Sequence, residues 1–138
     1  MSISTVTGYE PRFDIDMARG KVGEDKVVDI LSSLHAGRIE VKTDYGSNYT
    51  GNLYIEFEKE DRQGNWVPSG ISTTEADAWA FAFSNGVIFV ETESLKELCR
   101  EFYRSNHIGY RAGNENSAGS RGVLLPIQDL TDRMRNFK

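Results

Sequence analysis

The sequence predicts a mixed α/β fold in which helices flank one central sheet. Segments that alternate apolar and polar residues, as half-buried strands do, are interspersed with segments whose apolar residues recur at helical spacing. A continuous apolar run, Val87–Val90, follows Gly86 and is typical of a central strand. With 138 residues the chain can bury a core as a single domain. We expect that core to lie in about residues 13–105, with a basic polar loop and an edge strand in residues 106–138.

The first half of the chain predicts one helix and a hairpin. Residues 13–17 alternate and predict a short strand, and residues 24–35 predict a helix that ends at Gly37. Residues 38–44 and 53–58 alternate again, and the turn-rich stretch between them predicts that they pair as a hairpin.

The second half predicts two further helices. Ser72 with Glu75, and Ser94 with Glu97, have the spacing of a capping box, and each pair predicts a helix that begins there. The buried stripes expected on these helices are Ala76, Trp79, Ala80 and Phe83 on the first, and Leu95, Leu98 and Phe102 on the second.

The end of the chain predicts a loop and one strand. Residues 108–121 are polar and contain glycines, which predicts a loop. Residues 123–127 predict a late strand, and Pro126 favours an edge position because proline cannot donate a backbone hydrogen bond.

Composition narrows the class of protein. The single cysteine, Cys99, excludes an internal disulfide and fits a reducing compartment. There is no apolar run of membrane-spanning length and no signal-peptide pattern, so we expect a cytoplasmic protein without a membrane partner. The net charge of −5 is uneven, because the chain from Leu95 onward carries eight Lys and Arg against five Asp and Glu.

The expected hairpin would place acids near one another. If Ile39 and Val41 face the core together with the apolar residues of the second strand, Glu56 lies opposite Glu40 or Lys42, with Cβ atoms roughly 5 Å apart. Two carboxylates this close repel each other unless a cation intervenes, and Mg²⁺ prefers oxygen ligands. The alternative is a solvated polar face with Glu–Lys cross-strand pairs.

Glu24 adds a further acid. It precedes Val27, Val28 and Leu31 by three, four and seven residues and therefore lies on the apolar face of its predicted helix. It either reaches toward the sheet or is a first-turn glutamate stabilised by the helix dipole.

These acids and their order resemble the PD-(D/E)XK nuclease superfamily. Glu24 matches the glutamate of that superfamily's first helix, and Glu40-Val41-Lys42 matches its E-x-K tripeptide. The similarity covers about residues 13–92 and is greatest to small phage-type endonucleases and resolvases. The segments that carry it are Phe13–Met17, Gly23-Glu24, Ile39–Asp44, Thr50–Glu56, and Ser69-Gly70-Ile71 with Thr74, Ala76, Asp77 and Trp79.

The resemblance implies a restriction-endonuclease-like fold and a metal-dependent DNA endonuclease. Its cofactor would be Mg²⁺, with Mn²⁺ as a substitute, and its candidate substrates include branched and single-stranded DNA. A homodimer is implied, because two cuts need two sites. The implied setting is the cytoplasm of a bacterial or phage-infected cell.

The chain departs from the superfamily pattern at one place. No acid-bearing strand separates the first helix from Glu40, where the pattern has an aspartate. Either Glu40 replaces that aspartate, with Glu56 and Glu58 on the E-x-K strand and Lys42 as a lysine that has moved across the hairpin, or Asp44 is the additional acid beside Glu40-Val41-Lys42. The geometry of a hairpin favours the first, because Asp44 lies nearer the turn. The candidate metal ligands are therefore Glu40, Asp44 and Glu56, and the candidate catalytic residues are these three with Glu24 and Lys42. Lys42 would orient the attacking water or neutralise charge that develops in the transition state.

Two further groups of side chains are candidates for DNA binding. They are Ser69, Thr73 and Thr74 before the first predicted capping-box helix, and Arg104, Arg111 and Arg121 in or beside the late loop. A helix N-terminus binds phosphate and arginines bind the DNA backbone. The alternative interpretations of these side chains are helix capping for the first group and solvated loop charge for the second.

For the function of the whole protein, the alternatives are a catalytically inactive nuclease-like fold that binds DNA or protein, and a plain protein-interaction domain.

Overall fold

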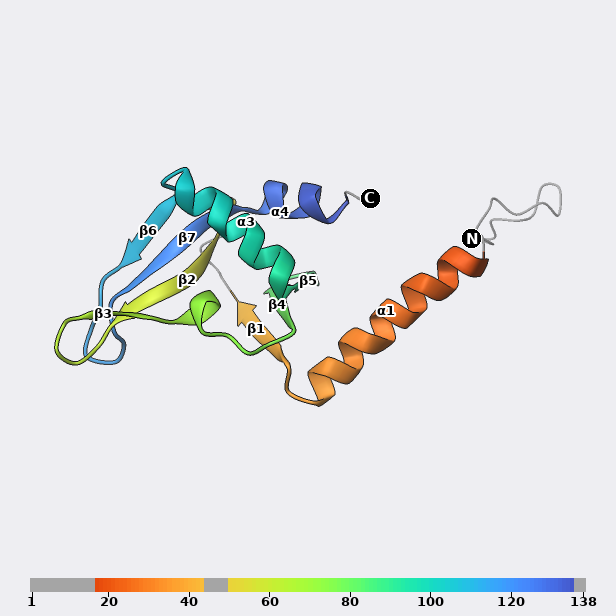
Figure 1. The fold of residues 1–138 in the computed structure, drawn as a ribbon, viewed down its shortest axis with the longest axis horizontal. Helices are drawn as coiled ribbons and strands as arrows, with labels where there is room; N and C mark the ends of the chain where they lie inside the picture. Colours follow the sequence, from red (N-terminus) through yellow and green to blue (C-terminus); the bar gives the residue numbers. More distant parts are fainter. Residues whose placement is uncertain (1–16, 44–49, 136–138) are drawn as a thin grey trace. The chain divides into compact units, whose positions relative to one another are not determined.

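The computed structural model describes residues 17–43 and 50–135, with side chains from residue 21 onward. The chain divides into two compact units, residues 1–36 and residues 37–138. The described part of the first unit is helix α1, and the second unit contains two β-sheets with helices (Figure 1). The fold is mixed α/β, as the sequence predicts, but it has two sheets where we expected one.

Helix α1 spans Met17–His35 and begins earlier than the predicted residue 24. Its end is as predicted, because Gly37 follows it with φ +74°, a conformation that favours glycine. Most of the strand predicted for residues 13–17 lies outside the described residues, and Met17 is helical.

The first sheet contains β1 (Ile39–Thr43), β4 (Ala78–Phe83) and β5 (Gly86–Glu91), in the order β1-β4-β5. β1 pairs with β4 in parallel, and β5 pairs with β4 in antiparallel. The predicted hairpin between residues 38–44 and 53–58 is therefore wrong. The strand predicted at Val87–Val90 is confirmed as part of β5, although it lies at the edge of its sheet rather than at the centre.

The helix predicted to begin at Ser72 is also wrong, because that region forms a single 3-10 turn, η1 (Gly70–Ser72), followed by β4. β4 alternates alanine with an aromatic residue, and Ala78–Phe81 are all buried. Burial on both faces removes the polar positions that distinguish a period of two from a helical period.

The second sheet contains β2 (Asn52–Glu60), β3 (Trp66–Pro68), β6 (Ile108–Arg111) and β7 (Ser120–Pro126), in the order β3-β2-β7-β6. The predicted late strand is confirmed as β7, but it lies between β2 and β6 and is not an edge strand. Part of the predicted loop 108–121 is β6, and β3 was not predicted.

The outer face of this second sheet is built around one tyrosine. A Cβ atom on Gly122 would lie 2.6 Å from Cζ of Tyr54, and one on Gly109 would lie 3.3 Å from its Cε2. The Tyr54 hydroxyl is hydrogen-bonded to Ser120 at 2.8 Å, and the guanidinium of Arg111 lies 3.8 Å from the ring centre. The two glycines therefore provide the space in which the Tyr54 ring lies.

Helices α3 (Thr92–Arg104) and α4 (Ile127–Met134) complete the second unit. α3 contacts β7 and β5, one strand from each sheet, and α4 contacts β7. α3 is confirmed, but it begins before Ser94 and its N-cap is Glu91, so the predicted capping box is wrong. The core includes side chains from both sheets and both helices: Leu53, Ile55, Trp79, Phe81, Val90, Leu95, Leu98, Val123, Leu125 and Leu130. No helix in the described ranges is long and apolar enough to span a membrane.

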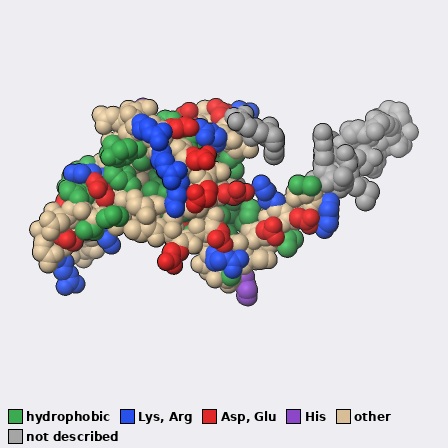
Figure 2. All heavy atoms as spheres, viewed as in Figure 1, with side chains coloured by type: hydrophobic (Ala, Val, Ile, Leu, Met, Phe, Trp, Pro, Cys, Tyr) green, Lys and Arg blue, Asp and Glu red, His purple; other side chains and the backbone are tan. Residues whose placement is uncertain are grey.

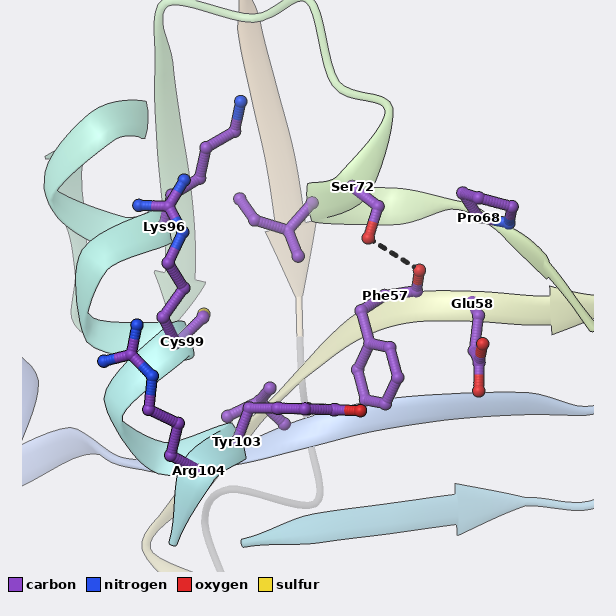
Figure 3. A pocket seen from close by; sticks show the side chains of 11 residues that line it. Phe57, Glu58, Pro68, Ser72, Lys96, Cys99, Tyr103 and Arg104 are labelled. Atoms are coloured by element: carbon purple, nitrogen blue, oxygen red, sulfur yellow. Dashed lines mark hydrogen bonds between the residues drawn. The ribbon is translucent and has the colours of Figure 1, made fainter. Parts of the chain in front are cut away.

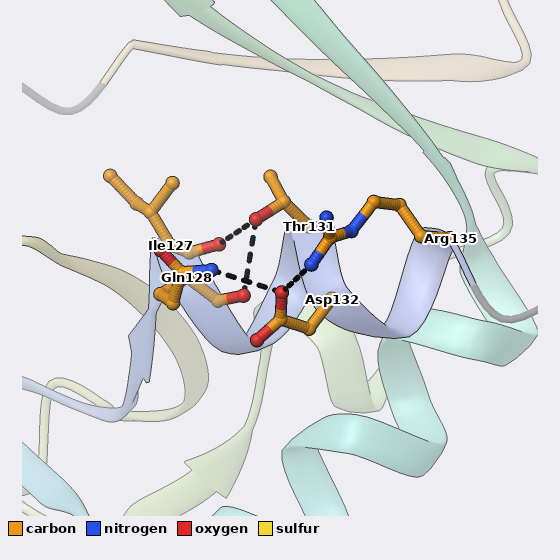
Figure 4. A network of polar contacts seen from close by, with 5 residues as sticks. All are labelled: Ile127, Gln128, Thr131, Asp132 and Arg135. Carbon is orange, nitrogen blue, oxygen red and sulfur yellow. Dashed lines mark hydrogen bonds and ion pairs between the residues drawn. The ribbon is translucent and has the colours of Figure 1, made fainter.

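Helix α4 was not predicted, and a local network of polar contacts accompanies it (Figure 4). The Thr131 hydroxyl donates to the carbonyl oxygens of Ile127 and Gln128, at 3.2 and 3.1 Å. Asp132 accepts a hydrogen bond from the Gln128 amide at 2.9 Å and forms an ion pair with Arg135. These contacts join successive turns of a helix of only eight residues.

Candidate functional site

Glu40 and Lys42 lie beside each other on the edge strand β1. Their side chains form an ion pair of 2.8 Å and are 42% and 48% exposed. Glu40 pairs with Trp79 and Lys42 with Phe81 in the parallel ladder, and the Lys42 ammonium lies 5.6 Å from the centre of the Trp79 ring. Paired residues in a parallel ladder share one face of the sheet, so both charged side chains lie on the core-facing side.

The predicted orientation of β1 is therefore reversed. We expected Val41 in the core, but it is 56% exposed, whereas Trp79 and Phe81 are buried beside Glu40 and Lys42. Because β1 is an edge strand, its charged side chains on the inner face reach solvent at the rim of the core.

The structure separates two of the predicted metal ligands. Glu40 is in the three-stranded sheet, whereas Glu56 is in the four-stranded sheet and lies opposite Gly122. Glu24 belongs to α1 in the first unit, and Asp44 lies outside the described residues. The described part of the chain contains no group of three or more His, Cys, Asp or Glu that could hold a metal ion. These residues alone do not form a Mg²⁺ site.

A second ion pair adjoins Glu40 and Lys42. Arg38 Nε lies 2.6 Å from Oδ2 of Asp77, and the Asp77 backbone N–H donates to the Arg38 carbonyl at 2.8 Å. Arg38 directly precedes β1, so Arg38, Glu40 and Lys42 bring charges to this strand in the order basic, acidic, basic.

Ser69, Thr73 and Thr74 do not precede an α-helix, so the reason for predicting a phosphate site there is wrong. Ser69 is buried, and its N–H donates to the carbonyl of Phe57 at 3.0 Å. The Ser72 hydroxyl donates to the same carbonyl at 2.8 Å. Gly70 (φ +53°) lies so close to β2 that a Cβ atom there would be 2.2 Å from the Glu56 carbonyl oxygen. The turn is thus held against β2 by these two hydrogen bonds and by the close approach of its backbone at Gly70.

A cavity of about 690 Å³ lies between α3, β2 and the η1 turn (Figure 3). Its lining comes from three strands of the second sheet, the turn and the helix, and one side carries cations from α3. The lining residues are Phe57, Glu58, Pro68, Ile71, Ser72, Lys96, Cys99, Arg100, Tyr103, Arg104 and Val123.

The cations of α3 form a row. Lys96, Arg100 and Arg104 are four residues apart and therefore lie on one face of the helix, about 6 Å from each other along its axis. Figure 2 shows Lys and Arg side chains gathered over α3 beside apolar side chains. Lys96 approaches Glu93 at 3.8 Å, and within the described ranges Arg100 and Arg104 form no ion pair. We call Lys96, Arg100 and Arg104 the α3 basic row.

An aromatic pair lies below the α3 basic row. The rings of Phe57 and Tyr103 meet edge to face with centres 5.3 Å apart, and Tyr103 is 52% exposed. The acid of the cavity, Glu58, accepts a hydrogen bond from Arg121 at 2.7 Å. Burial raises the pKa of the Cys99 thiol to about 12, so this thiol is protonated at neutral pH.

The three arginines predicted to bind DNA have different surroundings. Arg104 belongs to the α3 basic row, whereas Arg111 stacks on Tyr54 on the outer face of the second sheet. Arg121 is paired with Glu58, and its guanidinium lies 3.9 Å from the ring centre of Trp66. Only Arg104 among the three lines the cavity.

Sequence reasoning missed Lys96, Arg100 and Tyr103. The four-residue spacing of the basic residues in α3 was a usable signal, because it predicts a charged face on any helix. The strands that close the cavity could not be placed without their pairing. No protein-family model, curated protein or solved structure matches this chain, so its function is argued from its own residues and their arrangement.

Proposed function

We propose that this protein is a metal-dependent DNA endonuclease with Glu40 and Lys42 at its catalytic centre. The observation that carries the proposal is the pairing of these two side chains at 2.8 Å on a partly exposed strand edge. They are the acid and the amine of the E-x-K tripeptide through which the chain resembles the PD-(D/E)XK nucleases. A restriction-endonuclease-like fold is part of the same proposal.

The roles of the pair follow from their charges. The Lys42 ammonium would bind a phosphate oxygen and neutralise the charge that develops during phosphodiester hydrolysis. Arg38 adds a second positive charge at the start of this strand, although it is also paired with Asp77. Glu40 holds Lys42 in place and contributes one carboxylate to the centre.

A metal cofactor is implied by the resemblance to the PD-(D/E)XK nucleases. The described residues do not supply enough ligands to bind one. Glu40 contributes a single carboxylate, and Glu56 is in the other sheet. No catalytic step is therefore assigned to Mg²⁺.

The direct test is incubation with linear, nicked, branched and single-stranded DNA, in Mg²⁺, in Mn²⁺ and in EDTA. The proposal expects cleavage of at least one substrate with Mg²⁺ or Mn²⁺ and none in EDTA. Glu40→Gln should remove cleavage while the thermal unfolding profile stays close to that of the wild type. Uncut DNA in every metal condition, at stoichiometric protein, would refute the proposal.

A second candidate is a nucleic-acid-binding module without catalysis. The observation that favours it is the separation of Glu40 from Glu56 into different sheets. The two candidates differ in their response to metal. An endonuclease should gain thermal stability with Mn²⁺, because a ligand that binds only the folded state stabilises it, and should lose that gain in Glu40→Ala. A pure binding module should bind DNA equally well in EDTA and show no such gain.

A further inference from the structure

We propose that the cavity beside α3 binds a segment of single-stranded DNA, with phosphates on the α3 basic row and one base against Tyr103. This inference names the form of DNA that the proposed endonuclease engages and rests on the proposal that the protein acts on DNA. It concerns residues outside the Glu40–Lys42 centre.

The spacing of the cations suits a nucleic-acid strand. Lys96, Arg100 and Arg104 repeat at about 6 Å along the helix, which is similar to the separation of successive phosphates along an extended single strand. Arg100 and Arg104 are without ion-pair partners in the described ranges, so a phosphate would not have to displace a carboxylate from them. Neutralising phosphates in this way also releases counterions, which favours binding.

The side of the cavity that carries Glu58 does not repel a phosphate. Among the described residues, Glu58 is the only carboxylate that lines the cavity, and Arg121 donates to it at 2.7 Å. The pair is close to neutral as a unit. Arg100 and Arg104 therefore bring positive charge to this lining, which attracts an anion.

The aromatic pair argues for an unpaired base. Tyr103 is 52% exposed and is supported edge-on by Phe57, so one face of its ring can receive a base. The cavity volume of about 690 Å³ is in the range of small-molecule sites and accommodates a nucleobase. A base in a duplex is stacked and paired and cannot enter, which favours a single strand over a duplex.

The test measures binding apart from cleavage. Fluorescence anisotropy of a labelled oligothymidylate in EDTA, at several salt concentrations, gives the affinity and its salt dependence. Arg100→Gln and Arg104→Gln should each weaken binding and reduce the slope of log K against log salt by about 0.7, the value for one phosphate contact on a single strand. Lys59→Gln, an exposed lysine that does not line the cavity, is the matched control and should change neither.

The contribution of the base is tested separately. Tyr103→Ala should weaken binding about tenfold, a loss typical of one stacked base, whereas Tyr103→Phe should retain the affinity. An oligonucleotide of abasic residues should bind the wild type and Tyr103→Ala equally. Thermal unfolding of each variant checks that the fold is kept.

The outcomes separate this inference from the proposed function. Wild-type affinity in Arg100→Gln and Arg104→Gln, or tighter binding of duplex than of single strand, overturns the inference even if the protein cleaves DNA. Loss of binding in these variants together with no cleavage by the wild type supports the inference and refutes the endonuclease.

Discussion

Cys99 is the single cysteine of the chain, and it lies in α3 with its thiol buried against the core. Because burial raises its pKa to about 12, the nucleophilic thiolate is scarce at neutral pH. We predict that native protein at pH 8 reacts slowly with Ellman's reagent, and that protein unfolded in urea reacts at the rate of a free thiol. Rapid, stoichiometric labelling of the folded protein would contradict the burial.

Gly70 is a position where both space and backbone conformation require glycine. A Cβ atom there would lie 2.2 Å from the Glu56 carbonyl oxygen, and φ is +53°. We predict that Gly70→Ala lowers the free energy of unfolding by about 2 kcal/mol or more, measured by urea denaturation. Gly86→Ala is the control, because nothing lies within 4 Å of its added Cβ atom, and it should change stability far less.

The residues of β1 show what a local pattern can and cannot predict. The alternation of Ile39–Thr43 correctly predicted a strand. It did not predict which face of that strand meets the core, because Val41 and Lys42 are adjacent and the choice depends on the neighbouring strand. Pairing with Trp79 and Phe81 placed Lys42 on the inner side.

At the scale of elements, α3 and α4 are connected by one bidentate ion pair. A nitrogen of Arg133 lies 2.7 Å from each carboxylate oxygen of Glu101, and these hydrogen bonds hold the pKa of Glu101 below its ordinary value of 4.5. A lowered pKa in the folded state gives a stabilisation that is present above the unfolded pKa and is lost as the pH falls through the folded pKa.

We therefore predict that Glu101→Gln lowers Tm slightly at pH 7 and that its difference from the wild type disappears in acid, below the ordinary pKa of a glutamate. Differential scanning fluorimetry across the pH range measures this. Glu75→Gln, at an exposed glutamate, should show no such trend. A difference between Glu101→Gln and the wild type that persists unchanged at low pH would show that the ion pair is not its cause.

Helix α3, which the sequence predicts, has one polar and one apolar side. α3 has Leu95 and Leu98 on its buried side and basic residues on its exposed side, so the sequence shows the helical repeat of its apolar residues. β4 lacks such a contrast, since Ala78–Phe81 are all buried, and it was wrongly predicted as a helix. α4 is only eight residues long and was missed.

At the scale of the whole molecule, the errors concern which strands pair. β1 pairs with β4 rather than with β2, its neighbour in sequence, and β2 pairs with β7. Strand pairing over such distances depends on the total apolar surface that the two sheets bury against α3. The local sequence pattern of one strand carries no information about that total. The same choice separates Glu40 from Glu56 and brings β2 and β7 beneath the α3 basic row.

The proposed cleavage of DNA depends on Lys42. We predict that Lys42→Ala abolishes cleavage under single-turnover conditions with Mg²⁺, because the ammonium at the strand edge is lost, while its thermal unfolding stays close to that of the wild type. Lys59→Ala, which removes an exposed lysine of β2, should cleave at the wild-type rate. Cleavage by Lys42→Ala at that same rate would contradict the account.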